Sequence, residues 1–115
     1  MSRVKRGVAS HKRHKRLLKQ TKGYWGQRKN VIKRAKETLL RAMAFAFKGR
    51  KLKKRDMRGL FISRIASATK LRNTPYNRFI FGLKNAQVQL NRKMLSQLAI
   101  YEPKAFDKLV ALANK

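Results

Sequence analysis

Positive charge constrains this chain more than any other property of its sequence. Lysine and arginine account for 32 of the 115 residues, aspartate and glutamate for only four, and the formal net charge is +28. A chain this basic repels itself unless a polyanion neutralises it. Yet 43% of the residues are hydrophobic, close to the share in ordinary globular proteins. The sequence therefore predicts a partly packed protein whose partner is either nucleic acid or an anionic membrane surface.

The charge is concentrated in the first half of the chain. Residues 1–58 carry 22 lysines and arginines against two acids, a net of +20, whereas residues 59–115 carry ten against two, a net of +8. This asymmetry favours a basic arm followed by a more ordinary small domain. We expect a basic arm over 1–26, a long basic amphipathic helix region over 27–58 and a small globular helical domain over 59–115.

Apolar spacing predicts an all-α fold. From Gln27 to Phe47, apolar residues recur every three or four positions and cations occupy most of the others, as in an amphipathic helix. Gly49 either ends this helix or only weakens it by about 1 kcal/mol relative to alanine. A second apolar stripe follows over 50–72, as another helix or a continuation. No segment alternates apolar and polar residues for long enough to predict a strand.

Short polar segments separate three further predicted helices. Residues 73–75 (Asn-Thr-Pro) predict a left-handed Asn, then a Thr cap and a Pro at the first position of a helix over 75–86. An extended link over 87–90 precedes a helix capped by Asn91, and residues 102–103 (Glu-Pro) begin the last one. The apolar residues expected to form the core of the small domain are Leu60, Phe61, Ile65, Phe79, Ile80, Leu83, Leu90, Leu95, Leu98, Phe106 and Leu109.

The arm has no apolar stretch able to form a core. Ser10 is placed to cap a short helix that runs through Gln20 and ends near Gly23. Isolated helices of that length are marginal in water. We therefore expect residues 1–25 to be largely disordered in the free protein and to become ordered on binding.

Two aromatic residues lie between two glycines where the arm ends. The sequence Gly23-Tyr24-Trp25-Gly26 predicts a hinge between helices. Tyr24 and Trp25 either pack onto the next helix or stack on unpaired bases, as aromatic rings do at RNA sites. Glycine on each side permits close backbone approach and favours stacking, and one ring in each role is also consistent with the sequence.

The residue inventory does not favour catalysis. There is no cysteine, and the four acids are scattered, so the chain offers no acid–base pair or nucleophilic triad. His11 and His14 are three residues apart and share a helix face, but no cysteine or acid nearby completes a metal site. We predict no enzyme activity, no cofactor, no metal and no small-molecule substrate.

A membrane surface is the weaker of the two polyanion partners. Residues 27–48 have the basic amphipathic pattern of a surface-lying helix, but cations extend well beyond one helix face. The longest apolar run, residues 42–47, is far shorter than the roughly 20 residues that span a bilayer. We therefore expect no membrane partner.

The layout favours RNA over DNA. DNA-binding proteins usually present one recognition helix from a compact fold, often as a dimer, whereas a long basic arm and helix suit threading into a folded RNA. Because these two segments lack a core, we expect RNA to be their packing partner. A basic nucleoid-type DNA-binding protein is the alternative.

Five sequence blocks resemble a known family. They are RVKRG (3–7), HKRLLKQTKGYWGQRKN (14–30), KKRDMRGLFISRI (53–65), YNRFIFGLK (76–84) and LNRKMLSQLAI (90–100). They cover nearly the whole chain in one order, and they resemble the bacterial 50S large-subunit ribosomal protein number twenty family. KGYWG and the RFI-x-GLK block are the most specific.

The resemblance implies a place in the ribosome. Members of this family thread a basic N-terminal extension and a long helix into 23S rRNA, chiefly its second domain, beside neighbouring large-subunit proteins. Their C-terminal domain also binds rRNA, and they act early in large-subunit assembly. In some bacteria the protein represses its own operon by binding the mRNA. The implied location is the ribosome of the cytoplasm, or an organellar ribosome.

The chain departs from the family pattern at three places. Residues 47–50 (Phe-Lys-Gly-Arg) replace a more polar run, Asn73 stands where glycine is common, and Pro75 and Asn77 replace serines around Tyr76. These departures leave open whether the mRNA-repressor role is retained.

Basic clusters and the family blocks together indicate the rRNA-binding residues. In the arm and hinge these are Arg3, Lys5, Arg6, His11, Lys12, Arg13, His14, Lys15, Arg16, Lys19, Lys22, Tyr24 and Trp25. In the long helix region they are Arg28, Lys29, Lys33, Lys36, Lys48, Arg50, Lys51, Lys53, Lys54, Arg55 and Arg58. In the small domain they are Arg64, Arg78, Lys84, Arg92 and Lys93.

Overall fold

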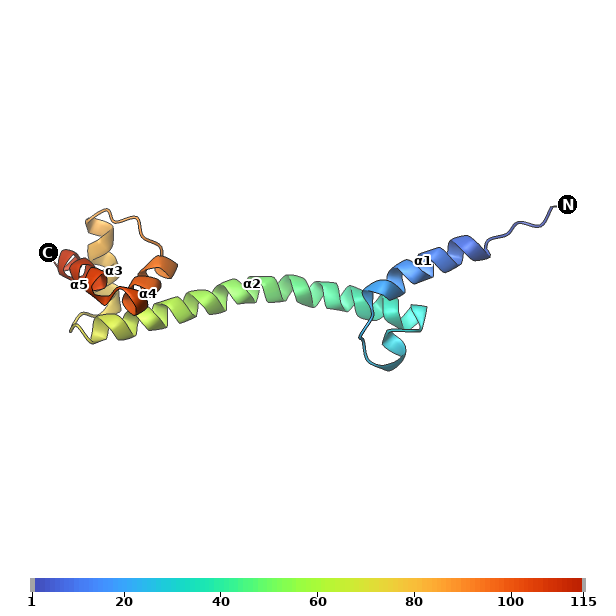
Figure 1. The fold of residues 1–115 in the computed structure, drawn as a ribbon, viewed down its shortest axis with the longest axis horizontal. Helices are drawn as coiled ribbons and strands as arrows, with labels where there is room; N and C mark the ends of the chain where they lie inside the picture. The colour runs from blue at the N-terminus through green and yellow to red at the C-terminus, as the bar shows by residue number, and fades with distance from the viewer. Residues whose placement is uncertain (1, 115) are drawn as a thin grey trace. The chain divides into compact units, whose positions relative to one another are not determined.

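The computed structural model describes residues 2–114, and helices are the only regular secondary structure in that range, so the all-α prediction is confirmed (Figure 1). In chain order the elements are α1 (Gly7–Gln20), the 3-10 turn η1 (Gly26–Arg28), α2 (Ile32–Lys70), α3 (Tyr76–Asn85), α4 (Arg92–Tyr101) and α5 (Pro103–Ala113). The chain divides into two compact units, residues 1–51 and residues 52–115, and the boundary falls within α2.

Helix α1 begins earlier than the sequence predicted. The backbone of Arg6 is already helical, and its carbonyl oxygen accepts a hydrogen bond from the Ser10 N–H at 3.2 Å. Ser10 therefore lies inside the first turn, and its prediction as the cap was wrong. The predicted end at Gln20 is confirmed. None of the α1 residues is buried.

The hinge between α1 and α2 depends on its glycines. Gly23 and Gly26 have φ angles of +86° and +53°, a region that side chains disfavour, so the predicted break is confirmed. The Arg28 N–H then bonds to the Trp25 carbonyl at 3.2 Å and closes the 3-10 turn. Because this turn holds Gln27, the α-helix starts only at Ile32, and its predicted start at Gln27 was wrong.

Two small buried residues form the packed part of the first unit. The Thr21 side chain is fully buried, with its hydroxyl oxygen 3.2 Å from the Leu18 carbonyl oxygen and 3.4 Å from that of Lys29. This hydroxyl links the end of α1 to the segment that precedes α2. Ala35, in the first turn of α2, is also fully buried. The larger apolar side chains further along α2, from Leu40 to Phe47, remain exposed or half-buried.

Helix α2 continues through Gly49, which decides the alternative that the sequence left open. The stripe over 50–72 is thus a continuation of the first helix rather than a separate one. At its end, the Asn73 N–H bonds to Lys70 and the Thr74 N–H bonds to Thr69, with Asn73 at φ +55°. This is a Schellman motif, and the predicted left-handed Asn73 is confirmed.

Helix α3 starts one residue later than predicted. The Thr74 hydroxyl accepts a hydrogen bond from the Asn114 side chain at 3.1 Å and lies 3.3 Å from the Arg72 carbonyl oxygen, so Thr74 does not cap α3. Pro75 occupies the cap position, and its carbonyl oxygen accepts from the Phe79 N–H. The Thr74 cap and Pro75 as first helical residue were therefore wrong.

The link from α3 to α4 is only partly extended. Gln87 has a φ of +54°, and the Val88 N–H bonds back to Leu83, which makes a second Schellman motif where the sequence predicted an extended residue. The predicted cap of α4 is confirmed, because the Asn91 side chain accepts from the Met94 N–H at 2.9 Å.

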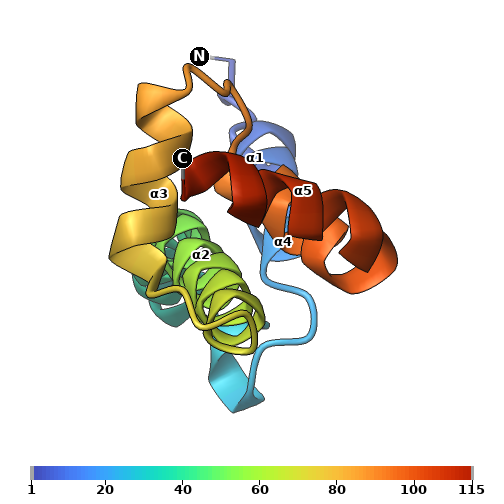
Figure 2. The ribbon, with the colours of Figure 1, turned by 90° about the vertical axis from the view of Figure 1, so that its left-hand side faces the viewer.

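The core of the second unit lies between the end of α2 and helices α3, α4 and α5. The Phe79 and Phe106 rings are 5.3 Å apart at its centre, and α5 lies across α3 (Figure 2). The buried cluster consists of Ile65, Ala68, Phe79, Leu83, Leu95, Phe106, Val110 and Ala113. Leu60 was wrongly predicted for the core: it is 41% exposed, more than one helical turn before the first buried residue of the cluster.

Gly82 lies where the backbones of α3 and α5 come close together. A Cβ atom at this position would overlap the backbone carbonyl group of Ala113. Replacing Gly82 with alanine should therefore lower the free energy of unfolding of the second unit by about 1–3 kcal/mol, the usual range for overpacking.

Gly59 is the matched control for this substitution. It lies in α2 of the same unit, and a Cβ atom added there would meet no neighbouring group within 4 Å. Gly59→Ala should stabilise the unit by up to about 1 kcal/mol. Urea unfolding followed on the amide signals of α3–α5 measures both variants, and equal stability of the two would contradict the packing described.

Candidate nucleic-acid interface

The residues predicted to bind rRNA lie on the surface. All of them are exposed except His14, Tyr24 and Arg92, which are half-buried. On α1, Lys12, Lys15, Arg16 and Lys19 are spaced at three and four residues and so share one face. Leu17 and Leu18, on the other side of the helix, are half-buried. Helix α1 therefore presents a continuous cationic face to its surroundings.

Acidic side chains neutralise almost none of this charge. Within residues 2–114 the single ion pair joins Arg72 to Asp107, and neither residue belongs to the predicted interface. The Arg72 guanidinium also lies 5.1 Å from the centre of the Phe106 ring, which gives this arginine a structural role. In the same range the predicted interface cations have no such acidic partner, and phosphates would replace their small counterions.

Two predicted interface cations have contacts within the protein. The Lys51 Nζ lies 4.6 Å over the ring of Phe47, an exposed residue one turn earlier on α2. In the second unit, the Arg92 Nε donates a hydrogen bond to the Tyr76 hydroxyl at 3.0 Å. This bond orients the Arg92 guanidinium and leaves its other N–H groups available as donors.

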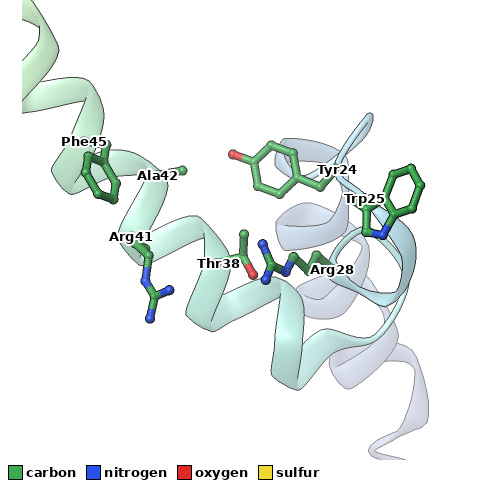
Figure 3. Close-up of a pocket in the computed structure, with 7 residues that line it drawn as sticks. All are labelled: Tyr24, Trp25, Arg28, Thr38, Arg41, Ala42 and Phe45. Atoms are coloured by element: carbon green, nitrogen blue, oxygen red, sulfur yellow. The ribbon is translucent and has the colours of Figure 1, made fainter.

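An aromatic hollow lies between the hinge and α2. It is open, has a volume of about 360 Å³, and is lined by Tyr24, Trp25, Arg28, Thr38, Arg41, Ala42 and Phe45. In Figure 3 the rings of Tyr24 and Phe45 lie on either side of Ala42, and Trp25 stands at the outer rim. Trp25 is 89% exposed, so internal packing was the wrong interpretation for this residue. Tyr24 is half-buried and extends from the hinge toward α2.

The sequence did not identify the α2 side of this hollow. Thr38, Arg41 and Phe45 follow one another at spacings of three and four residues, with Arg34 four residues earlier, so all four share a helix face. The apolar stripe that predicted this helix lies on a different face of α2. A search for arginine and aromatic residues together at helical spacing would have found this one.

Other classes of site find no support in the described part of the chain. Residues 2–114 contain no group of three or more histidine, cysteine or acidic side chains that could hold a metal ion. None of the helices in that range is long and apolar enough to cross a membrane.

Comparisons with known proteins agree on one family. The model of the family described as Ribosomal protein L20 matches residues 3–109. The large ribosomal subunit protein bL20 of Clostridium botulinum is 50% identical over 115 residues, which is all of this chain and 97% of the relative. The protein of the same name from Clostridium novyi is 51% identical over the same shares of both chains.

The absence of buried residues in α1 leads to a prediction about exchange. Without RNA, the amide hydrogens of residues 8–20 should exchange much faster than those of α3 and α5, because an isolated helix of this length is marginal. Addition of RNA should slow exchange in α1 and change α3 and α5 much less. Amide hydrogen exchange followed by NMR measures this. Strong protection of α1 without RNA would show that the predicted ordering on binding is wrong.

Proposed function

The chain belongs to the ribosomal protein L20 family, and from this premise we propose that it binds 23S rRNA directly, chiefly its second domain, and supports early assembly of the large subunit. As a member of this family it is a structural part of the large ribosomal subunit and not an enzyme. The finer assignment rests on one observation: the first unit is strongly basic and lacks a core of its own.

Charge and packing in the first unit support this proposal together. Residues 1–51 carry 18 lysines and arginines against one acid, and the buried residues of this unit are the small Thr21 and Ala35. Leu40 and Phe45 are 63% and 64% exposed. A folded RNA would neutralise the cations and cover these apolar side chains at the same time. A duplex presents phosphates but few apolar surfaces outside its grooves, so the nucleoid-type alternative explains the charge better than the exposed rings.

The second unit supports an additional role in RNA binding. It has its own buried core, carries a net charge of +11 over residues 52–115, and holds Arg92 in place through Tyr76. We propose that this unit also binds RNA without help from the arm. We include binding to the mRNA of its own operon, and thus translational repression, in the proposal for this unit.

The proposed target gives a direct experiment. The protein should protect a defined site in the second domain of 23S rRNA from hydroxyl radicals at moderate salt. A duplex DNA of similar length, tested in parallel, should show only weak protection that disappears as the salt concentration rises. Equal and salt-sensitive protection of both nucleic acids would favour the nucleoid-type alternative.

The cationic face of α1 gives a quantitative prediction. Lys12, Arg16 and Lys19 are exposed on that face, and replacing all three with glutamine should remove about three phosphate contacts. The slope of log K against log salt for 23S rRNA binding should then become shallower by about 2–3. Lys104→Gln with Lys108→Gln is the control, since these exposed lysines of α5 lie outside the predicted interface. An equal change in slope for both variants would mean that α1 has no special part in binding.

A further inference from the structure

We propose that the aromatic hollow holds one unpaired RNA base, inserted between Tyr24 and Phe45 over Ala42, with an adjoining phosphate on Arg28 and Arg41. This inference rests on the RNA binding proposed above and names the part of the RNA that the first unit recognises. It also adds residues of α2, Ala42 and Phe45 among them, to the interface.

The shape of the hollow suits a single planar group. Its volume of about 360 Å³ lies near the lower end of the range for small-ligand sites, about 300–1,000 Å³. Ala42 leaves a gap between the rings of Tyr24 and Phe45 that a longer side chain would fill (Figure 3). A base inserted there would lie against aromatic carbon, which raises affinity for any base.

The backbone of the hinge determines where its two aromatic side chains lie. Gly23 and Gly26 adopt positive φ angles, and the Arg28 N–H closes the 3-10 turn on the Trp25 carbonyl. These features set the directions of Tyr24 and Trp25 once the hinge is folded. Within residues 2–114 very little covers Trp25, which is 89% exposed. A nucleotide next to the inserted base would bury part of this ring.

The charge beside the hollow identifies the ligand as a nucleic acid. Arg28, Thr38 and Arg41 also line a smaller polar hollow of about 160 Å³, together with Arg34 and Glu37. Three guanidinium groups against one carboxylate leave a net charge of +2 there. An aromatic slot directly beside a cationic one matches a base joined to its phosphate. An apolar peptide or a lipid chain would leave these arginines without a partner.

The test separates the base from the phosphates. The full-length chain is titrated with two RNA hexamers of identical charge, one fully abasic and one carrying a single central adenine. The adenine hexamer should bind roughly 5- to 150-fold more tightly, the range for stacking of one base. Trp25 is the only tryptophan in the chain and lines the hollow, so its emission should change more with the adenine hexamer than with the abasic one. Equal affinity for the two hexamers would overturn the proposal.

A filled slot provides the matched variant. Ala42→Leu places a larger side chain between Tyr24 and Phe45 and keeps a strong helix former in α2, so the preference for the adenine hexamer should be lost. Ala44→Leu makes the same change at an exposed position of α2 outside the hollow, and should keep the preference. Far-UV circular dichroism checks that both variants are helical. A preference that survives Ala42→Leu would locate the base elsewhere and overturn the proposal.

Failure of this inference differs from failure of the proposed function. Only the base site is wrong if the 23S rRNA footprint is present but the original chain shows no adenine preference, or keeps that preference in Ala42→Leu. If the adenine preference depends on Ala42 while no specific footprint forms on 23S rRNA, the base site holds and the rRNA assignment is wrong.

Discussion

Mutual repulsion among exposed cations is the constraint on which the structure of this protein depends. Within residues 2–114 only one ion pair forms, between Arg72 and Asp107, and it lies in the second unit. The remaining charge has to be balanced by ions or by a partner. An element can therefore be stable by itself only where burial of apolar surface exceeds this repulsion. That condition separates the two units: Phe79 and Phe106 meet in a shared core, whereas the apolar side chains of the first unit stay largely exposed.

The second unit meets the condition through close packing. Gly82 lets α3 approach the backbone of α5 at Ala113, and this approach brings the aromatic residues of both helices into contact. Left-handed residues, Asn73 and Gln87, end two of the helices with backbone hydrogen bonds rather than with charged side chains. The unit thus needs few of its cations for folding, and most of them remain available for binding. The first unit differs, because both its apolar side chains and its cations largely lack partners within the described part of the chain.

The periodicity of apolar residues predicted most of the fold. Most of the errors arose where a residue expected to cap a helix makes a different hydrogen bond. Helical spacing correctly placed residues such as Ile65 and Phe79 in a core, because burial of a stripe dominates the energy of a helix. The caps were less predictable. Ser10 and Thr74 are both suitable capping residues, but the backbone N–H of Ser10 and the hydroxyl of Thr74 are committed to other hydrogen bonds. The hinge at Trp25 was evident from its glycines. The α2 side of the hollow was not, because Phe45 lies across the hollow from Tyr24 only after the chain has turned at the hinge.

Affinity and register have different origins at such an interface. Lysine and arginine contacts to phosphates hold an RNA strongly, but every nucleotide offers the same phosphate, so a cationic face such as that of α1 can bind at many positions along a strand. A slot that accepts an unpaired base is selective in another way, since bases are available only where a fold leaves them unstacked. Placing this slot at the glycine hinge, directly beside three arginines, joins the two effects at one point. The cations then supply most of the binding energy, while the base in the hollow determines where on the folded RNA the arm is anchored.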